Sequence, residues 1–150
     1  MKYTLAFFLI ALPAFADVIG KAVVVDGDTL RMGEERIRLH GIDAPETRQT
    51  CQRDEIKWLC GQEASRALRD YVRNVDLRCE HLNIDRYGRI VAKCFKPDGM
   101  DIGAWMVLNG WALAYRRYST DYVDAEAKAQ VAGLGLWTSR FIAPWYWRRR

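Results

Sequence analysis

Three short segments of the sequence hold most of the side chains that could carry out chemistry. They read Asp-Gly-Asp-Thr at 26–29, Arg-Leu-His-Gly-Ile-Asp-Ala-Pro-Glu at 38–46 and Asp-Arg-Tyr-Gly-Arg at 85–89. The first two segments supply oxygen ligands of the kind that hard divalent cations prefer. The last two supply arginines, whose planar guanidinium groups match a phosphate in two-point contacts. A cation beside two such arginines would neutralise the charge that develops during phosphoryl transfer.

The cation would be held by groups from the first two segments. Asp28 and Asp43 lie at the ends of neighbouring predicted strands, and Pro45 biases Ala44 toward an extended backbone whose carbonyl could face the same ion. Calcium and magnesium both suit such oxygen ligands. The alternative is that Asp-Gly and Asp-Ala-Pro are ordinary turn formers.

The catalytic groups would come from the second and third segments. Arg38 and Arg89 would hold a phosphoryl group between them, and Glu46 would be the spare carboxylate that polarises a water. The alternative is that these arginines are solvated charges on a strand face, which is how we interpret Arg36. Because both Arg38 and Arg89 should be partly exposed, we expect that replacing either one does not strongly unfold the protein.

Hydrophobic periodicity predicts the elements that must position these groups. Alternating or β-branched runs predict strands over 18–25, 29–32, 35–40, 75–82 and 90–95, and helical spacing predicts helices over 61–73, 101–109 and 121–131. Residues 43–57 are predicted to be irregular. Three strands, a helix, two strands and further helices is the order of an α+β fold built on a five-stranded Greek-key barrel, the OB-fold. We expect Trp105, Trp111 and Trp137 to pack in the core.

The N-terminus predicts export. Residues 1–16 combine an early lysine, a short apolar run and a small-residue end, as in a signal peptide cut after Ala16. The apolar run is too short for a membrane span, so we expect no stable membrane association after cleavage. The remaining chain predicts one domain over 17–143 and an aromatic, basic tail over 144–150. Without Lys2 and the three terminal arginines, the 23 basic and 19 acidic residues become 19 of each, so the basic character belongs mostly to the tail.

Four cysteines in an exported chain predict two disulfides, although four buried free thiols are the alternative. Three pairings are open on count alone. If Arg86 and Tyr87 are the central residues of the turn that joins the last two predicted strands, Cys79 lies directly opposite Cys94, within disulfide reach. The predicted pairs are therefore Cys79–Cys94 and Cys51–Cys60.

The three segments, in this order, resemble the thermonuclease family, the staphylococcal-nuclease-like enzymes. The resemblance covers nearly all of the chain after the signal peptide, and it implies an OB-fold and calcium-dependent hydrolysis of DNA and RNA phosphodiesters to 3′-phosphate products. It implies calcium ligands at Asp28, Asp43 and the Ala44 carbonyl, and a catalytic trio of Arg38, Glu46 and Arg89.

The same resemblance implies further roles. Arg86, Tyr87 and Tyr115 would contact the bound nucleotide and its terminal phosphate, and Asp26 would support a calcium ligand without touching the ion. Aromatic rings that stack on bases suit a single-stranded or frayed substrate. The sequence departs from the best-known member of the family in having Ala44 in place of threonine, a shorter turn between Met32 and Arg38, and four added cysteines.

We therefore expect an exported, monomeric, calcium-dependent nuclease, periplasmic or extracellular. One rival is a secreted OB-fold module that binds nucleic acid or oligosaccharide without cutting it, and another is a calcium-stabilised structural domain. The tail has two interpretations, a nonspecific grip on nucleic acid or a disordered end. His40 is expected to be a solvated residue on a strand face.

Overall fold

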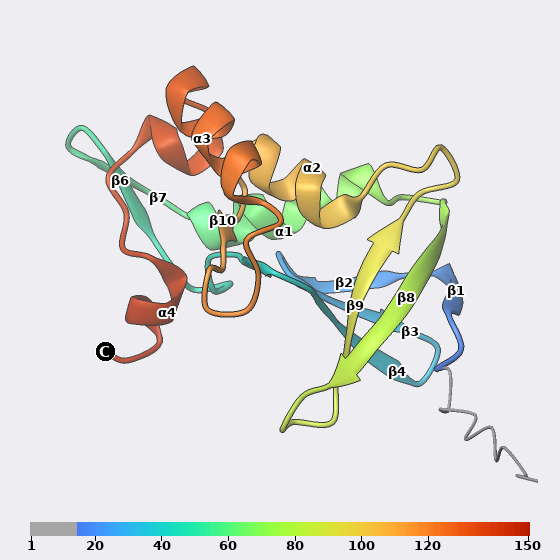
Figure 1. Ribbon diagram of the computed structural model, residues 1–150. Helices are drawn as coiled ribbons and strands as arrows, with labels where there is room; N and C mark the ends of the chain where they lie inside the picture. The colour runs from blue at the N-terminus through green and yellow to red at the C-terminus, as the bar shows by residue number, and fades with distance from the viewer. Residues whose placement is uncertain (1–14) are drawn as a thin grey trace, which may run out of the picture.

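The sheet of this protein closes into a barrel because its first strand is bent. The computed structural model describes residues 15–150, so residues 1–14 of the predicted signal peptide lie outside the described part of the chain. β1 (Val18–Lys21) and β2 (Val23–Asp26) are separated by Ala22 alone, yet they occupy the two ends of a six-stranded sheet with the order β1-β8-β9-β4-β3-β2. Joining the two ends through this bend closes the sheet (Figure 1).

The topology of the closed sheet is that of the OB-fold. Its remaining strands are β3 (Thr29–Met32), β4 (Glu35–Leu39), β8 (Asp76–Ile84) and β9 (Ile90–Phe95). Neighbouring strands pair antiparallel except β4 and β9, which pair parallel with Ile37 opposite Ile90. With β1 and β2 counted as one bent strand, the barrel has the predicted five strands in Greek-key order. The predicted α+β fold class is confirmed.

Each of the three predicted helices is present within two residues of its expected bounds. They are α1 (Cys60–Tyr71), α2 (Ile102–Leu108) and α3 (Val123–Ala132). α1 buries Ala64 and Leu68, on one face of the helix. α2 begins after Asp101, whose side chain accepts a hydrogen bond from the Ala104 amide at 3.1 Å. α3 ends where Gly133 takes the left-handed backbone conformation, with φ 62°.

The segment predicted to be irregular contains regular structure, so that prediction was wrong. β5 (Ile42–Asp43) pairs with β10 (Leu113–Ala114), and β6 (Cys51–Arg53) forms a small antiparallel hairpin with β7 (Ile56–Trp58). The hairpin lacks the apolar alternation that marks a half-buried strand, since half of the residues in its two strands are exposed and only Cys51 is buried. Its ladder is instead held against α1 by the Cys51–Cys60 disulfide.

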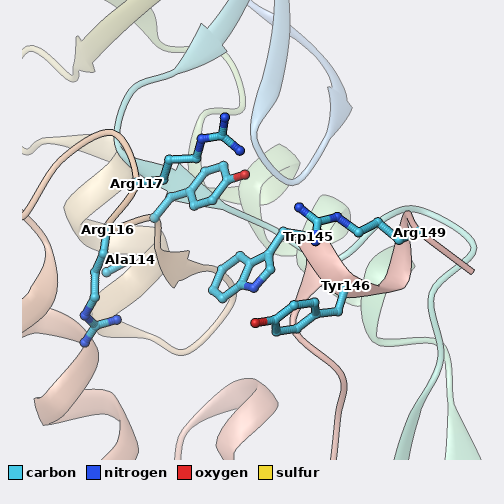
Figure 2. Close-up of a pocket in the computed structure, with 7 residues that line it drawn as sticks. Ala114, Arg116, Arg117, Trp145, Tyr146 and Arg149 are labelled. Carbon is cyan, nitrogen blue, oxygen red and sulfur yellow. The ribbon is translucent and has the colours of Figure 1, made fainter.

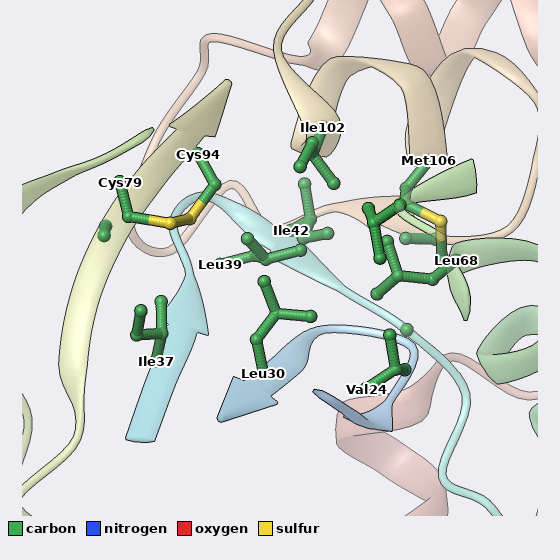
Figure 3. Packing of buried hydrophobic residues seen from close by; sticks show 14 of the residues in the cluster. Val24, Leu30, Ile37, Leu39, Ile42, Leu68, Cys79, Cys94, Ile102 and Met106 are labelled. Carbon is green, nitrogen blue, oxygen red and sulfur yellow. A yellow bond between two sulfur atoms is a disulfide. The ribbon is translucent and has the colours of Figure 1, made fainter. Parts of the chain in front are cut away.

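Two clusters of buried side chains hold the molecule together. The larger fills the barrel and the space under α1 and α2, and includes Val24, Leu30, Ile37, Leu39, Ile42, Leu68, Ile102 and Met106 (Figure 3). The smaller joins the Cys51–Cys60 disulfide to Leu113 and Leu136. As predicted, Trp105 and Trp111 pack against the larger cluster and Trp137 against the smaller.

Both predicted disulfides are present. Cys79 on β8 lies directly opposite Cys94 on β9, and their bond crosses the barrel interior, where both residues are fully buried (Figure 3). The predicted turn places Arg86 and Tyr87 at its centre, with the Gly88 amide donating to the Asp85 carbonyl. A bulge between His81 and Asn83 shifts the register nearer the turn, beyond the disulfide.

The last residues form a short helix and do not trail away from the domain. α4 (Pro144–Trp147) follows a short 3₁₀ helix, η1 (Gly135–Thr138), and packs on the body of the protein. The interpretation of the tail as a disordered end was therefore wrong. Within residues 15–150, every helix falls short of the length and apolar character that a bilayer span requires.

Candidate active site

Asp28 and Asp43 lie side by side although they belong to different strand ends. Asp28 lies in the turn between β2 and β3, and Asp43 ends β5. The Ala44 amide donates to Asp28 Oδ2 at 2.8 Å, and the Thr29 hydroxyl donates to Asp28 Oδ1 at 3.1 Å. The Asp43 side chain is fully buried. The two predicted metal-binding carboxylates and the backbone of Ala44 are thus brought together, as expected.

Arg38 lies between these two carboxylates. It is on β4, where its backbone pairs with Thr29 of β3. Its Nη2 atom lies 3.2 Å from Asp28 Oδ2 and 3.3 Å from Asp43 Oδ1, while Nη1 donates to the Leu39 carbonyl at 2.9 Å. Only 14% of its side chain is exposed, less than the sequence suggested. Arg38 therefore neutralises part of the negative charge of Asp28 and Asp43, and its guanidinium group could also contact an anionic ligand.

Arg89 reaches the same region from the turn between β8 and β9. Its Nε atom donates to Asp85 Oδ2 at 2.8 Å, which fixes the side chain within its own turn. Its Nη1 atom lies 3.5 Å from the Thr29 hydroxyl, which in turn contacts Asp28. The parallel pairing of β4 with β9 makes this approach possible, because it sets the start of β9 beside Arg38.

Glu46 lies on the loop after β5 and is more exposed than the aspartates. The loop is braced by Gln49, whose amide donates to the Glu46 carbonyl at 2.7 Å and whose side chain accepts from the Glu46 amide at 3.3 Å. Gly61 packs tightly against this loop, since a Cβ atom on Gly61 would be 1.8 Å from the Glu46 carbonyl oxygen. The Glu46 side chain is 38% exposed, so it is accessible to a water or a substrate.

A sixth residue, which the sequence did not indicate, completes the contacts. Arg148, just beyond α4, donates from Nη1 and Nη2 to the two carboxylate oxygens of Asp43, at 3.0 and 2.8 Å. Its Nη1 atom also donates to Glu46 Oε1 at 2.8 Å. In the sequence Arg148 was only one member of a basic run, and no local pattern points from position 148 to position 43.

We call Asp28, Arg38, Asp43, Glu46 and Arg89 the acid–arginine cluster. All five are linked by the contacts given above, through Thr29 on one side and Arg148 on the other. The structure places the residues of the sequence prediction close together, and it adds a contact that the sequence did not predict, from the Arg148 guanidinium group to two of the three carboxylates.

Burial and mutual repulsion strongly affect the charges of these carboxylates. The pKa of Asp43 is raised to about 6, mainly by burial and also by the Asp28 charge, while the hydrogen bonds from Arg148 oppose the rise. Burial also opposes ionisation of Asp28, but Arg38 and the Ala44 amide overcome it and hold the Asp28 pKa below its ordinary value. The site thus favours one firmly ionised carboxylate next to a second that depends on nearby cations.

Asp26 lies behind Asp28, as predicted. Its Oδ1 atom accepts a hydrogen bond from the Asp28 amide at 3.1 Å. Burial, followed by the Asp28 charge, raises the Asp26 pKa to about 7. Asp26 therefore contributes to the geometry and charge of the Asp28 position.

The donor set fits a hard divalent cation held by few protein ligands. Asp28 and Asp43 offer carboxylate oxygens, and the guanidinium groups of Arg38 and Arg148 show that this position attracts positive charge. Among residues 15–150, three or more His, Cys, Asp or Glu side chains nowhere gather closely enough to form a metal cage by themselves. A cation here would accordingly need backbone carbonyl, water or substrate oxygens as well.

The predicted substrate contacts lie on two surfaces. Arg86 and Tyr87 form the exposed tip of the β8–β9 turn, where Arg86 donates to the Tyr87 hydroxyl at 2.8 Å and the Arg89 guanidinium lies 5.5 Å from the Tyr87 ring centre. Arg36, interpreted as a solvated charge, is exposed as expected but donates to the Tyr87 carbonyl at 2.8 Å. This tip presents cations around an aromatic ring.

Tyr115 lies on the other surface, beside the C-terminal segment. Its ring stacks on Trp145, with 5.2 Å between ring centres and an angle of 4° between planes. Tyr115, Trp145 and their neighbours line a cavity of about 270 Å³ into which Arg117 and Arg149 also project (Figure 2). Cationic and aromatic groups together suit an anionic ligand with a flat ring.

The fold and the acid–arginine cluster together define an OB-fold domain with an acidic site lined by arginines. Comparison with known families agrees with this class. The chain belongs to the family described as staphylococcal nuclease homologue, whose model matches residues 36–139. The resemblance seen in the sequence is thereby confirmed.

Several curated proteins are similar to the chain over most of its length. An uncharacterized endonuclease from Escherichia coli is 35% identical, with 97% of this chain and 95% of the relative covered. Micrococcal nuclease from Shigella flexneri is 33% identical, with 94% and 86% covered. Succinoglycan biosynthesis protein ExoI from Rhizobium meliloti (strain 1021) is 36% identical over 82% of this chain, which spans 66% of that relative.

Proposed function

We propose that this protein is an exported, calcium-dependent nuclease that hydrolyses phosphodiester bonds of DNA and RNA to 3′-phosphate products. The observation that carries the proposal is the acid–arginine cluster, in which Arg38 bridges two buried carboxylates while Glu46 and Arg89 lie on either side. A module that only binds nucleic acid would have no need of two buried, mutually repelling carboxylates. The nuclease names of two relatives support the same activity.

Different residues of the acid–arginine cluster have different roles in the proposed hydrolysis. Glu46, exposed at the edge of the cluster, accepts a proton from the attacking water. Arg38 and Arg89 donate to the non-bridging phosphate oxygens and stabilise the charge that grows there. Asp28, Asp43 and the Ala44 carbonyl would hold the calcium ion, which supplies charge neutralisation and orientation of the phosphate when bound.

The products follow from which bond breaks. Attack in line with the 5′-oxygen forms a new phosphorus–oxygen bond to water and breaks the bond to the 5′-oxygen, which leaves the phosphate on the 3′ side. The leaving oxygen takes its proton from solvent water, because arginine side chains stay charged in proteins and are poor acids.

The surfaces around the cluster suit a flexible strand. Tyr87 is exposed at a turn tip with three arginines around it, Arg36, Arg86 and Arg89. Exposed rings stack on bases whose faces are free, which favours single-stranded or frayed substrates. The cationic contacts act on the phosphate backbone, which DNA and RNA share.

The disulfides support an oxidising location. Each of the four cysteines is in a disulfide and three of them are fully buried, which is typical of proteins in the periplasm or outside the cell. We propose that the domain acts there as a monomer, after removal of residues 1–16.

One assay tests the proposal. The purified domain is incubated with single-stranded DNA and with RNA, in calcium and in chelator, next to Glu46→Gln and the matched control Glu34→Gln in the exposed turn between β3 and β4. We expect cleavage to 3′-phosphate ends only in calcium, with Glu46→Gln reduced by about 10²–10⁴-fold and Glu34→Gln unaffected. Tight binding of both polymers without cleavage under any condition would favour the non-catalytic OB-fold module instead.

A further inference from the structure

The C-terminal segment reaches into the acid–arginine cluster and occupies its most buried carboxylate. Both oxygens of Asp43 accept hydrogen bonds from Arg148, at 3.0 and 2.8 Å, and Asp43 has no exposed side-chain surface. The same guanidinium also holds Glu46 at 2.8 Å. One side chain from the end of the chain therefore engages both a proposed calcium ligand and the proposed water-activating group.

The segment that carries Arg148 is attached to the body at two further places. The Gln49 side chain donates to the Ile142 carbonyl at 2.6 Å, just before α4, and Trp145 lies flat against Tyr115. Figure 2 shows Trp145, Tyr146 and Arg149 together along the cavity beside Tyr115. The segment thus covers one face of a ring that would otherwise be free to stack on a base.

Arg148 and a divalent cation compete for the same Asp43 oxygens. A cation needs those oxygens at about 2.3–2.6 Å, and both already accept hydrogen bonds from the guanidinium. The two positively charged groups would also repel each other at such short range. Binding of the cation is therefore favoured by departure of Arg148 from Asp43.

We infer that residues 144–150 are an intramolecular inhibitor, in which Arg148 takes the place of the divalent cation on Asp43 and Trp145 covers Tyr115, so that the closed segment excludes both cation and substrate. The inference rests on the proposed function for the identity of the cation, and it goes beyond that function by assigning a regulated, closed state. Release of the segment frees Asp43, Glu46 and Tyr115 together, because all three contacts belong to one short stretch of chain.

The closed state should weaken apparent calcium affinity in proportion to its population. If one molecule in ten is open, the apparent dissociation constant is tenfold higher than that of the open form. Removing Arg148 should abolish this penalty, and weakening the Trp145 contact should reduce it.

Calcium binding to the full domain, measured by calorimetry without substrate, tests the inference. Arg148→Ala should bind calcium about tenfold or more tightly than the parent protein, and Trp145→Ala, which keeps Arg148, should also bind more tightly. Arg150→Ala is the matched control. It removes the same charge two residues further along the chain, from a side chain that lies over the Trp147 ring and not on Asp43. Its affinity should stay within about twofold of the parent.

Hydrogen–deuterium exchange provides a second readout that does not depend on activity. In the parent protein, calcium should speed exchange of the amides of residues 146–150, which are hydrogen-bonded within the closed segment. Equal calcium affinity in the parent, Arg148→Ala and Trp145→Ala would overturn the inhibitory role while leaving the calcium site intact. Absence of calcium binding in every variant would instead overturn the proposed cofactor, and the competition with it.

Discussion

Asp28 and Asp43 share a single guanidinium nitrogen, since Arg38 Nη2 lies 3.2 Å from one carboxylate and 3.3 Å from the other. Asp28 lies in the turn before β3 and Asp43 ends β5, and Arg38 comes from β4 between them. The β3–β4 hairpin brings Asp28 to Arg38, since the Leu39 amide donates to the Asp28 carbonyl at 2.9 Å, and the turn at His40 and Gly41 brings Asp43 to Arg38. The three residues therefore meet within one continuous stretch of chain.

Arg89→Ala should lower kcat without loosening the fold. The expected loss is about 10²–10³-fold, as for removal of one strong donor to a transition state. Its ion pair with Asp85 is local and partly exposed, so the free energy of unfolding should change by less than about 1 kcal/mol. Single-turnover cleavage and urea denaturation measure the two effects, with Arg31→Ala on the exposed side of β3 as control. Near-normal turnover would remove Arg89 from the catalytic trio.

Arg38→Ala should lose both activity and stability. The structure changes the expectation drawn from sequence, because Arg38 is mostly buried and its removal leaves Asp28 without its cation. Removing one partner of a buried ion pair lowers the free energy of unfolding by about 3 kcal/mol or more. Urea denaturation of Arg38→Ala beside Arg89→Ala gives a direct comparison. Equal stability of the two variants would show that Asp28 is better solvated than the structure indicates.

Gly61→Ala should impair the Glu46 loop even though alanine is the better helix former. Helix propensity alone predicts a gain of about 1 kcal/mol at this position in α1. The new Cβ would lie 1.8 Å from the Glu46 carbonyl oxygen, so the loop must move, at a cost of about 1–3 kcal/mol. The unfolding temperature and the cleavage rate should both fall. Gln62→Ala, at the exposed neighbouring position, should change neither quantity appreciably. A more stable, fully active Gly61→Ala protein would contradict the close approach.

Removing the Cys79–Cys94 bond should destabilise the barrel directly. The bond closes a loop with a sequence separation of 15, for which chain entropy predicts about 3 kcal/mol. The double variant Cys79→Ala/Cys94→Ala should unfold at a correspondingly lower urea concentration. The parent protein in excess reductant should lose at least as much stability, because Cys51–Cys60 is reduced as well. Unchanged unfolding in both cases would show that packing alone holds β8 to β9.

His40 should make the protein less stable in mild acid. Burial, followed by the charge of Lys93, lowers the His40 pKa, and Asp121 only partly opposes this. In the pH window just below the ordinary value of 6.5, the unfolded chain therefore binds a proton that the folded chain does not, so stability falls as pH falls.

The variant His40→Gln should lose less stability between pH 7.5 and pH 5 than the parent protein. Urea denaturation at both pH values, in chelator, measures the difference. Identical pH dependence of the two proteins would mean that His40 ionises equally easily in both states. The His40 side chain is partly buried, whereas the sequence predicted a solvated residue on a strand face.

Sequence patterns located the barrel strands where alternation was strong. β3 and β9 begin and end at the predicted residues; β9 alternates fully and partly buried side chains, and β3 buries every side chain but that of Arg31. The run 18–25 was predicted as one strand, and the structure splits it at Ala22 so that its halves pair with different neighbours. The β6–β7 hairpin was missed because a disulfide, not an apolar face, holds it in place.

The candidate site was predictable where its residues lie in compact motifs, and not elsewhere. Asp28, Arg38, Asp43, Glu46 and Arg89 all belong to short segments in which turn formers stand next to charges. Arg148 meets Asp43 across more than one hundred residues of chain, and only the folded arrangement of η1 and α4 sets their separation. Such a contact leaves no trace in residue spacing.

The two ends of the described chain lie on opposite sides of the molecule. β1 lies at the far side of the barrel from α4, and the end marked C is next to the segment that covers Tyr115 (Figure 1). An affinity tag or fluorophore fused after Arg150 would lie beside Arg148 and would change how tightly Arg148 binds Asp43. Fusion ahead of Val18 keeps such additions remote from the acid–arginine cluster, and is the appropriate attachment point for immobilising this protein.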